Sequence, residues 1–191
     1  MAGRQAKTLA PRALRATLRY VHRHADPVRS RVIILLSVRA GLRAAEIAKL
    51  EWPMVLDASG QVAETMDVRN CIAKKGRGRR IPIHNDLHHE LAILLRRGDC
   101  EGPIIRSKHG GAMKANSIVN WFIVLYRELG LEGCSSHSGR RTFITQAARL
   151  AHRAHGSLRD VQLLCGHKSI ETTQHYIDGD SDAQRRLIAL L

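Results

Sequence analysis

Six polar side chains of this chain are of the types that exchange phosphoester bonds without a metal ion. Such a reaction needs cations that offset the charge growing on the non-bridging oxygens, a nucleophile that attacks phosphorus, and a proton for the leaving oxygen. One phenol, two guanidiniums, two imidazoles and one amine together meet these needs. The six residues are Arg43, Lys75, His137, Arg140, His167 and Tyr176.

Two arginines are the candidates for a phosphate clamp. A guanidinium is always charged, and its forked donors match the oxygens of a phosphate. Arg43 follows Gly41 and Leu42 at an expected helix start, and Arg140 falls in the first turn of another expected helix. Arginine is abundant in this chain, so either residue alone is equally consistent with a surface position. Their placement relative to the other candidates favours the clamp.

Two histidines can hydrogen-bond to the same oxygens or assist proton transfer. His137 lies three residues before Arg140, so on one helical turn the two side chains point the same way. His167 follows Gly166 in an expected turn directly after a helix. The alternative for each is a histidine that caps a helix or packs in the core.

Lys75 and Tyr176 complete the set. Lys75 is expected at the tip of a glycine-punctuated basic hairpin, from which its amine can protonate the leaving 5′ oxygen. The alternative for Lys75 is one more phosphate contact, and neighbouring Lys74 suits that role equally well. Tyr176, nine residues after His167, is the candidate nucleophile of a covalent phosphotyrosine, although a tyrosine after a helix is more often a packing residue.

Composition points to a polyanionic partner. The net charge is +14 in 191 residues, an excess typical of nucleic-acid binding, with a merely basic surface as the alternative. Aromatic residues make up 4%, too few for a platform that stacks single-stranded bases. The same basic residues predict DNA contacts around the hairpin and the second arginine, by Lys74, Arg77, Arg79, Arg80 and Arg141.

No cofactor, metal or membrane is expected. The four cysteines lie 29 to 34 residues apart without a CxxC pair, which predicts reduced thiols and no zinc knuckle. His84, His88 and His89 have helical metal-ligand spacing but no well-placed further ligand. The start of the chain has no signal-peptide pattern, and the longest apolar run, Val32 to Leu36, is too short to span a bilayer. A cytoplasmic protein, at the nucleoid when bound to DNA, is expected.

Helical periodicity predicts a mainly helical α+β domain. Proline should open the first two helices, at Pro11 (with Thr8 as cap) and Pro27, and serine should cap two late ones. A partly alternating stretch at 62–73, the basic hairpin at 74–80 and a return strand at 80–83 predict a small three-stranded antiparallel sheet within the helical bundle. We expect a flexible N-terminus at 1–7, a catalytic domain at 8–180, and a C-terminal segment at 181–191 that docks on a neighbouring protomer.

The motifs AGLRAAEI (40–47), AKKGRGRRIPI (73–83), HSGRRTFIT (137–145) and LLCGHKSIETTQHY (163–176) together resemble the tyrosine recombinase, or phage integrase, family. The resemblance implies the catalytic-domain fold of that family and the six candidates as its catalytic set. Glu46 would be the acidic residue after the first arginine, orienting Arg43 or a neighbouring helix. The implied activity is site-specific breakage and rejoining of double-stranded DNA by a homotetramer, without metal or ATP.

Two motif departures and one absence qualify this resemblance. The family often has Leu-Arg-His where this chain has Gly139-Arg140-Arg141, and Leu where Cys165 stands; neither change removes a catalytic group. Most members also carry an N-terminal DNA-clamping domain. The chain resembles the short members, such as fimbrial phase-switch inversion recombinases. Unless it is a fragment, its hold on DNA would then come from one face, from protein–protein contacts of an assembly, or from a partner such as an accessory DNA-binding protein.

Two other functions fit the same residues. A type IB topoisomerase-like enzyme would nick and reseal one duplex, and so relax supercoils without exchange between sites. A non-catalytic regulator or accessory factor would bind DNA without cutting it.

Overall fold

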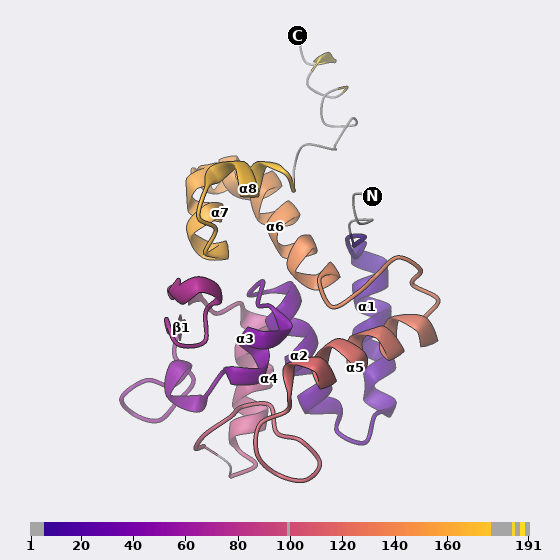
Figure 1. Ribbon diagram of the computed structural model, residues 1–191, viewed down its shortest axis with the longest axis vertical. Helices are drawn as coiled ribbons and strands as arrows, with labels where there is room; N and C mark the ends of the chain where they lie inside the picture. Colours follow the sequence, from indigo (N-terminus) through magenta and orange to yellow (C-terminus); the bar gives the residue numbers. More distant parts are fainter. Residues whose placement is uncertain (1–5, 99, 177–184, 186–187, 190–191) are drawn as a thin grey trace. The chain divides into compact units, whose positions relative to one another are not determined.

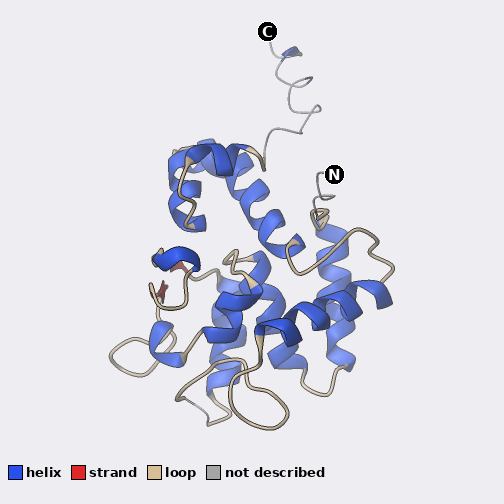
Figure 2. Ribbon diagram, in the orientation of Figure 1, coloured by secondary structure: helices blue, strands red, loops and turns tan. Residues whose placement is uncertain are grey.

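The computed structural model describes residues 6–98, 100–176, 185 and 188–189. It divides the chain into two compact units, Met1–Phe143 and Ile144–Leu191, and the boundary falls within helix α6, Ser138–Leu150. Helices make up most of both units, as Figure 2 shows. The α+β, mainly helical class predicted from the sequence is confirmed. The C-terminal segment predicted to dock on a neighbour lies almost entirely outside the described residues.

Proline opens the first two helices of the first unit. Helix α1 spans Pro11–Tyr20, a short 3₁₀ turn follows at Val21–Arg23, and α2 spans Pro27–Val38. Proline suits the first turn because the amide it lacks would have no partner within the helix. Ala10, not Thr8, is the residue before α1, so the predicted cap is wrong. The carboxylate of Asp26 caps α2 by accepting from the Arg29 amide, 3.0 Å away.

Helix α2 is the centre of the first core. Its residues from Val32 to Leu36 are at most 1% exposed. It packs against α4 (Asn85–Leu95), while α3 (Ala44–Lys49) packs against α5 (Ala115–Glu128), an arrangement that can be followed in Figure 1. The start of α3 carries two of the candidate residues, with Arg43 directly before the helix and Glu46 in its first turn.

The sheet of the described residues has two strands, not the three predicted. β1, Thr65–Val68, pairs antiparallel with β2, Arg79–Pro82, in a register that sets Val68 opposite Arg79. Upstream, Leu56 and Val62 make a single isolated bridge. The chain between them curls tightly because the Asp57 carboxylate accepts from the Ser59 and Gln61 amides, which leaves no length for a third strand.

The basic connection between β1 and β2 is a closed loop rather than a tight hairpin. Its neck is a hydrogen bond of 2.7 Å from the Gly78 amide to the Asn70 side-chain oxygen. A β-carbon at Gly78 would lie 2.7 Å from that oxygen and from the Val68 carbonyl, so only glycine fits this neck. The 3₁₀ turn Lys74–Gly76 lies within the loop, between the two residues that the neck hydrogen bond joins.

The second unit consists of short helices in close succession. After α6 come a 3₁₀ turn at Ala151–Ala154, α7 at Leu158–Cys165 and α8 at Ile170–Gln174. Ser157 caps α7 in a box with Asp160, as predicted. Helix α7 ends at Gly166, whose φ of 63° is left-handed and therefore suits glycine. This turn leads directly into His167.

Candidate active site

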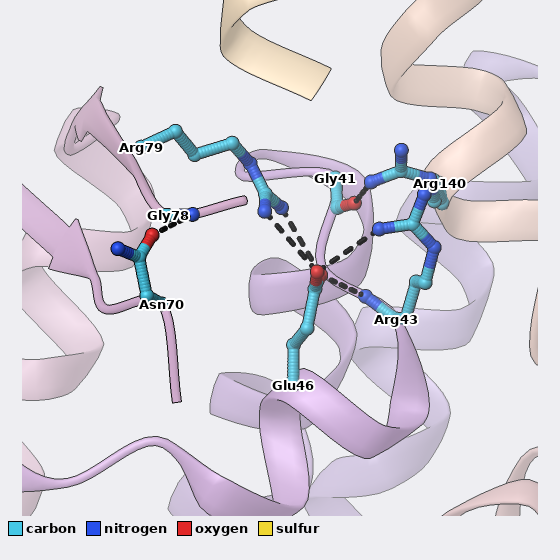
Figure 3. A network of polar contacts seen from close by, with 7 residues as sticks. All are labelled: Gly41, Arg43, Glu46, Asn70, Gly78, Arg79 and Arg140. Atoms are coloured by element: carbon cyan, nitrogen blue, oxygen red, sulfur yellow. Dashed lines mark hydrogen bonds and ion pairs between the residues drawn. The ribbon is translucent and has the colours of Figure 1, made fainter. Parts of the chain in front are cut away.

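A buried carboxylate joins two arginines from different elements of the first unit. Glu46, in the first turn of α3, is 1% exposed. Its Oε1 accepts from Nη1 of Arg43 at 2.9 Å and its Oε2 from the Arg43 amide at 2.9 Å. From β2, Arg79 donates to the same two oxygens at 3.1 and 3.0 Å. Figure 3 shows the carboxylate between the two guanidiniums.

Arg79 faces the interior because of its position in β2. Side chains of a strand alternate between its faces, and here Arg79 and Ile81 are buried while Arg80 and Pro82 are exposed. The side chain of Arg79 is 5% exposed and ion-paired with Glu46. It therefore does not lie on the surface, where the predicted DNA contact would need it. Arg79 lies two residues before the apolar Ile81, and this two-residue spacing was the sequence signal that could have indicated the burial of Arg79.

The two arginines hold Glu46 in its ionised form. Burial raises the pKa of the Glu46 carboxyl, but the hydrogen bonds and charge of Arg79, and then those of Arg43, outweigh burial and hold the pKa at about 2. A buried carboxylate that accepts several charge-assisted hydrogen bonds remains charged at any ordinary pH. Glu46 thereby fixes the guanidinium of Arg43 relative to the sheet.

Arg140 is held by a separate contact, from α6 to the loop before α3. It is 3% exposed, and its Nη1 donates to the Gly41 carbonyl, as Figure 3 also shows. Gly41 has a φ of 64°, and a β-carbon there would lie 2.5 Å from the Phe143 ring. Next to Arg140, a β-carbon at Gly139 would clash with the Ser37 side chain. Two glycines thus allow α6 to approach the loop closely enough for the contact.

His137 lies within the field of three cations. Its side chain is exposed, and its pKa is lowered by partial burial first and then by the charges of Arg140, Arg43 and Lys74. The last three must be near to act in this way, so the fold brings together His137 and both predicted clamp arginines. These surroundings therefore favour the neutral imidazole.

Lys75 stands out through its backbone. It has a φ of 61°, a left-handed conformation that costs a residue with a side chain about 1 kcal/mol or more. Lys74 and Lys75 are both exposed, in the 3₁₀ turn of the closed loop. Strained positions of this kind concentrate at functional sites, and the strain falls on the residue that the sequence motifs select.

Of the other predicted DNA contacts, Arg77 and Arg80 are exposed and Arg141 is half-buried. They line different parts of the first unit: the closed loop, the outer face of β2, and the first turns of α6.

The second unit brings His167 and Tyr176 together. Their rings stack with centroids 5.6 Å apart and planes at 19°; we call them the histidine–tyrosine pair. Nδ1 of His167 is 3.0 Å from the Thr173 hydroxyl. The His167 carbonyl accepts from Nε2 of the Gln162 side chain at 3.2 Å, and the Tyr176 carbonyl accepts from the Thr145 hydroxyl at 3.2 Å. Both residues of the pair are thus held by a hydrogen bond to the backbone carbonyl as well as by the ring stack.

The structure describes the predicted residues in two separate sets. Arg43, His137 and Arg140 lie together in the first unit, with Lys75 in its exposed loop, and His167 and Tyr176 lie together in the second. Sequence reasoning did not single out Thr173 or Asn70. Among the described residues, no group of three or more histidine, cysteine or acidic side chains could hold a metal ion. Nor is any helix in this part of the chain long and apolar enough to cross a membrane.

A mainly helical scaffold with a small antiparallel sheet carries these side chains. The sequence profile of the phage integrase family matches residues 7–182, so the chain belongs to that family. This settles the resemblance inferred from the motifs.

Curated relatives agree with this assignment. The tyrosine recombinase XerC of Rickettsia typhi is 30% identical over 154 residues, covering 78% of this chain and 47% of XerC. The tyrosine recombinase XerA of Pyrococcus furiosus is 30% identical over 155 residues, covering 79% of this chain and 50% of XerA. The chain therefore spans about half the length of the curated relatives it matches.

Solved structures share the fold. The crystal structure of XerA recombinase superposes with a TM-score of 0.75 at 20% identity, over 96% of this chain and 64% of XerA. The Tn1549 transposon integrase in complex with transposon right end DNA gives a TM-score of 0.73 at 17% identity, over 96% of this chain and 65% of the integrase. The fold predicted from the resemblance is confirmed.

Proposed function

We propose that this chain is the catalytic domain of a site-specific DNA recombinase that breaks and rejoins DNA through a 3′-phosphotyrosyl intermediate on Tyr176. The observation that carries the proposal is the presence of all six groups of a metal-free phosphoryl transfer in a chain of the phage integrase family. The curated relatives named above are tyrosine recombinases. The catalytic domain would comprise residues 8–180.

In the first unit, Arg43 and Arg140 would bind the non-bridging oxygens of the scissile phosphate. A clamp works best when its donors are oriented before the reaction, because reorganisation then adds nothing to the barrier. Glu46 orients Arg43, and Arg79 in turn holds Glu46 against the sheet. We therefore assign Arg79 to positioning rather than to DNA contact.

His137 and Lys75 would serve the same phosphate. His137, whose lowered pKa favours the neutral imidazole, can donate one hydrogen bond to a phosphate oxygen and accept another from elsewhere. Lys75 would donate a proton to the leaving 5′ oxygen. The closed neck at Gly78 limits how far the loop that carries Lys75 can move.

In the second unit, the phenolic oxygen of Tyr176 would attack phosphorus. The new bond joins that oxygen to phosphorus, the bond to the 5′ oxygen breaks, and a free 5′ hydroxyl leaves. Tyr176 loses its proton and the 5′ oxygen gains one, so the step balances without ATP or an oxidant. One phosphoester replaces another, and the reverse attack by a 5′ hydroxyl reseals the strand.

Double-stranded DNA with specific recombination sites would be the substrate. Exposed Lys74, Arg77 and Arg80, with Arg141, would contact its backbone by charge. Structures of two family relatives hold DNA: the lambda integrase as a dimer on a core site, and XerH on its difH substrate. By the same resemblance, four protomers would act together in the cytoplasm at the nucleoid, with an accessory DNA-binding protein.

Covalent trapping tests this function. The protein is mixed with duplex DNA from the flanks of its own gene, carrying nicks just beyond each tested phosphate so that resealing is impossible. We expect a protein–DNA band that survives denaturant and disappears in Tyr176→Phe. Tyr20→Phe, which changes a half-buried tyrosine of α1, serves as the matched control. Tight DNA binding without any such band would refute the proposal in favour of a non-catalytic binder, and supercoil relaxation without exchange would favour the topoisomerase-like alternative.

A further inference from the structure

A cavity of about 380 Å³ lies at the start of α2, in the first unit. Its buried lining is apolar and includes Trp52, which is 1% exposed, and Ile104, which is 4% exposed. Its more exposed lining is charged: Asp26 and Arg29 come from the start of α2, and Arg97 follows α4. Ligand cavities have this size, with apolar walls and a few placed polar groups.

The cavity is separate from the candidate active site. Arg43 follows the other end of α2, whose 12 residues extend over about 18 Å. Within the part of the chain that the structure describes, the cavity lining includes neither Arg43 nor any arginine or lysine proposed to contact DNA. No step of the proposed reaction therefore uses this cavity.

Backbone hydrogen bonds hold the walls of the cavity in place. The connection between α4 and α5 supplies one wall, and it is joined to the chain around Trp52. The Ile104 amide donates to the Leu50 carbonyl at 3.0 Å, and the Trp52 amide donates to the Gly102 carbonyl at 3.0 Å. A ligand would thus enter a preformed site, and little of its binding free energy would be spent on ordering the walls.

Two arginines of the cavity are oriented by one carboxylate. Oδ1 of Asp26 accepts from Nη1 of Arg97 at 2.9 Å, and Nε of Arg29 lies 3.9 Å from Oδ2. Burial raises the pKa of Asp26, but the hydrogen bonds from the Arg29 amide and the Arg97 side chain outweigh burial and hold the pKa below its usual value. Asp26 is therefore ionised at neutral pH and keeps both guanidiniums at the cavity.

Cations exceed anions in the cavity lining. Arg29, Arg97 and Arg106 line it together with one carboxylate, that of Asp26. A guanidinium carries five N–H donors. Nη1 of Arg29 donates to the Arg106 carbonyl and Nη1 of Arg97 to Asp26, whereas Nη2 of Arg29 and Nη2 of Arg97 donate to nothing else among the described residues. Forked donors of this kind match the oxygens of a carboxylate or a phosphate.

We propose that this cavity binds a small organic anion, with its carboxylate or phosphate between Arg29 and Arg97 and its apolar part against Trp52. The two kinds of lining require the two parts of the ligand. An inorganic anion would leave the apolar wall in contact with water, and a neutral ligand would leave the excess positive charge unmatched.

Titration of the full chain with phenyl phosphate tests the proposal. In ¹⁵N–¹H spectra at neutral pH and about 0.15 M salt, which screens non-specific attraction, we expect saturable shifts of the Trp52 indole and of the Arg29 and Arg97 side chains. Benzoate tests a carboxylate on the same ring, and saturation by either compound supports the proposal. Inorganic phosphate should bind at least about tenfold more weakly, because it buries no apolar surface, and neutral benzyl alcohol should not saturate. Equal affinity for inorganic phosphate, or shifts that never saturate, would overturn the proposal.

Two neighbouring arginines provide a matched pair of variants. Arg97→Met removes a charged donor from the cavity, and we expect the Kd for phenyl phosphate to rise at least about tenfold. Arg96→Met removes the same charge from an exposed residue that does not line the cavity, and should change the Kd by less than about twofold. Urea unfolding checks that both variants remain folded. Equal effects of the two substitutions would show a general response to charge and would refute a defined site.

Competition with DNA separates this site from the DNA interface. We expect a saturating concentration of duplex DNA to leave the Kd for phenyl phosphate unchanged, and Arg97→Met to bind the duplex as the wild type does. Displacement of phenyl phosphate by the duplex would overturn the proposal and place the cavity in the DNA interface. These measurements need no DNA cleavage, so the absence of a Tyr176 adduct would count against the proposed function alone.

Discussion

The two sets of candidate residues are organised in opposite ways. In the first unit, charges are held by contacts between residues distant in sequence: Arg79 reaches Glu46 across 33 positions and Arg140 reaches Gly41 across 99. In the second, a turn and a short helix suffice, and His167 meets Thr173 six positions later. In the first unit Glu46 and Arg79 form a buried ion pair, whereas the histidine–tyrosine pair of the second unit is joined by a ring stack.

This difference has an energetic meaning. Buried ion pairs are intolerant of losing one partner, because the remaining charge stays desolvated. A ring stack contributes less, and its loss leaves no orphaned charge. Folding stability and the orientation of Arg43, proposed as part of a phosphate clamp, are therefore coupled in the first unit, whereas Tyr176, the proposed nucleophile of the second, can be altered with little effect on folding.

Removing the central carboxylate should have the largest effect. We expect Glu46→Gln to lower the free energy of unfolding by about 4 kcal/mol, since it leaves the buried Arg79 guanidinium without its counter-charge. Urea unfolding at pH 7 measures this, with the exposed Glu64→Gln as control. A loss no greater than that of the control would contradict the coupling described for the first unit.

The same variant should lose less folding stability than the wild type as the pH falls into the acidic range. The pKa of Glu46 is about 2 in the folded protein against 4.5 ordinarily, so its stabilisation is complete above about pH 4.5 and is lost as the pH falls toward 2. At 1.36 kcal/mol per unit this amounts to about 3 kcal/mol. Unfolding curves across that pH range should show a steep wild-type decline that is shallower in Glu46→Gln.

Substitutions of the two adjacent arginines of β2 should affect different properties, one the folding stability and the other the binding of DNA. We expect Arg79→Met to cost about 3 kcal/mol of stability with little change in the salt dependence of DNA binding. Arg80→Met, on the exposed face, should change stability by less than about 0.5 kcal/mol and reduce the salt slope by about one. Chemical unfolding and a salt titration of binding measure both. An Arg79→Met variant that is stable but has a reduced salt slope would restore Arg79 to the DNA-contacting residues.

Changes to the histidine–tyrosine pair should be milder for folding. Tyr176→Ala removes the stack and should cost about 1 kcal/mol, whereas Tyr176→Phe keeps the ring and should unfold as the wild type does. Hydrogen exchange of amides in α7 and α8 localises the effect. Equal losses in the two variants would mean that the hydroxyl, rather than the stack, stabilises this region.

The smallest effect is expected at His137. Its pKa is lowered in the folded protein by partial burial and by Arg140, Arg43 and Lys74, so protonation favours the unfolded chain. Stability should therefore decline slightly as the pH falls below about 6.5, and His137→Gln should remove that decline. Solvent screening keeps the change small because the side chain is exposed. Thermal melts from pH 8 to 5 compare the two proteins.

Local signals predicted the helices well. Prolines at helix starts and the Ser157 capping box act within one turn of chain, and the structure confirms these starts at Pro11, Pro27 and Leu158. The cap at Thr8 and the third strand were wrong. Ala10 is the residue directly before α1, and the chain before β1 forms a single isolated bridge between Leu56 and Val62 instead of a strand.

The candidate site was predictable as a set of residues but not as a set of contacts. The motif order selected Arg43, Arg140, His167 and Tyr176 without any structure. The burial of Arg79 depends on which face of β2 meets α3, and the choice of Thr173 over neighbouring Thr172 depends on the pitch of α8. Both are tertiary facts. Two adjacent threonines, like two adjacent arginines, carry the same local signal.

The left-handed backbone conformation of Lys75 lowers folding stability at a position where the proposed reaction needs a lysine. Glycine would adopt that conformation without steric cost, so Lys75→Gly should favour folding while it deletes the amine. Any redesign or directed evolution that rewards thermal stability alone would drift toward replacing Lys75. A selection that also rewards strand exchange would keep the lysine and its strain. Position 75 is therefore where selection for thermostability alone would remove the proton donor proposed for the leaving 5′ oxygen.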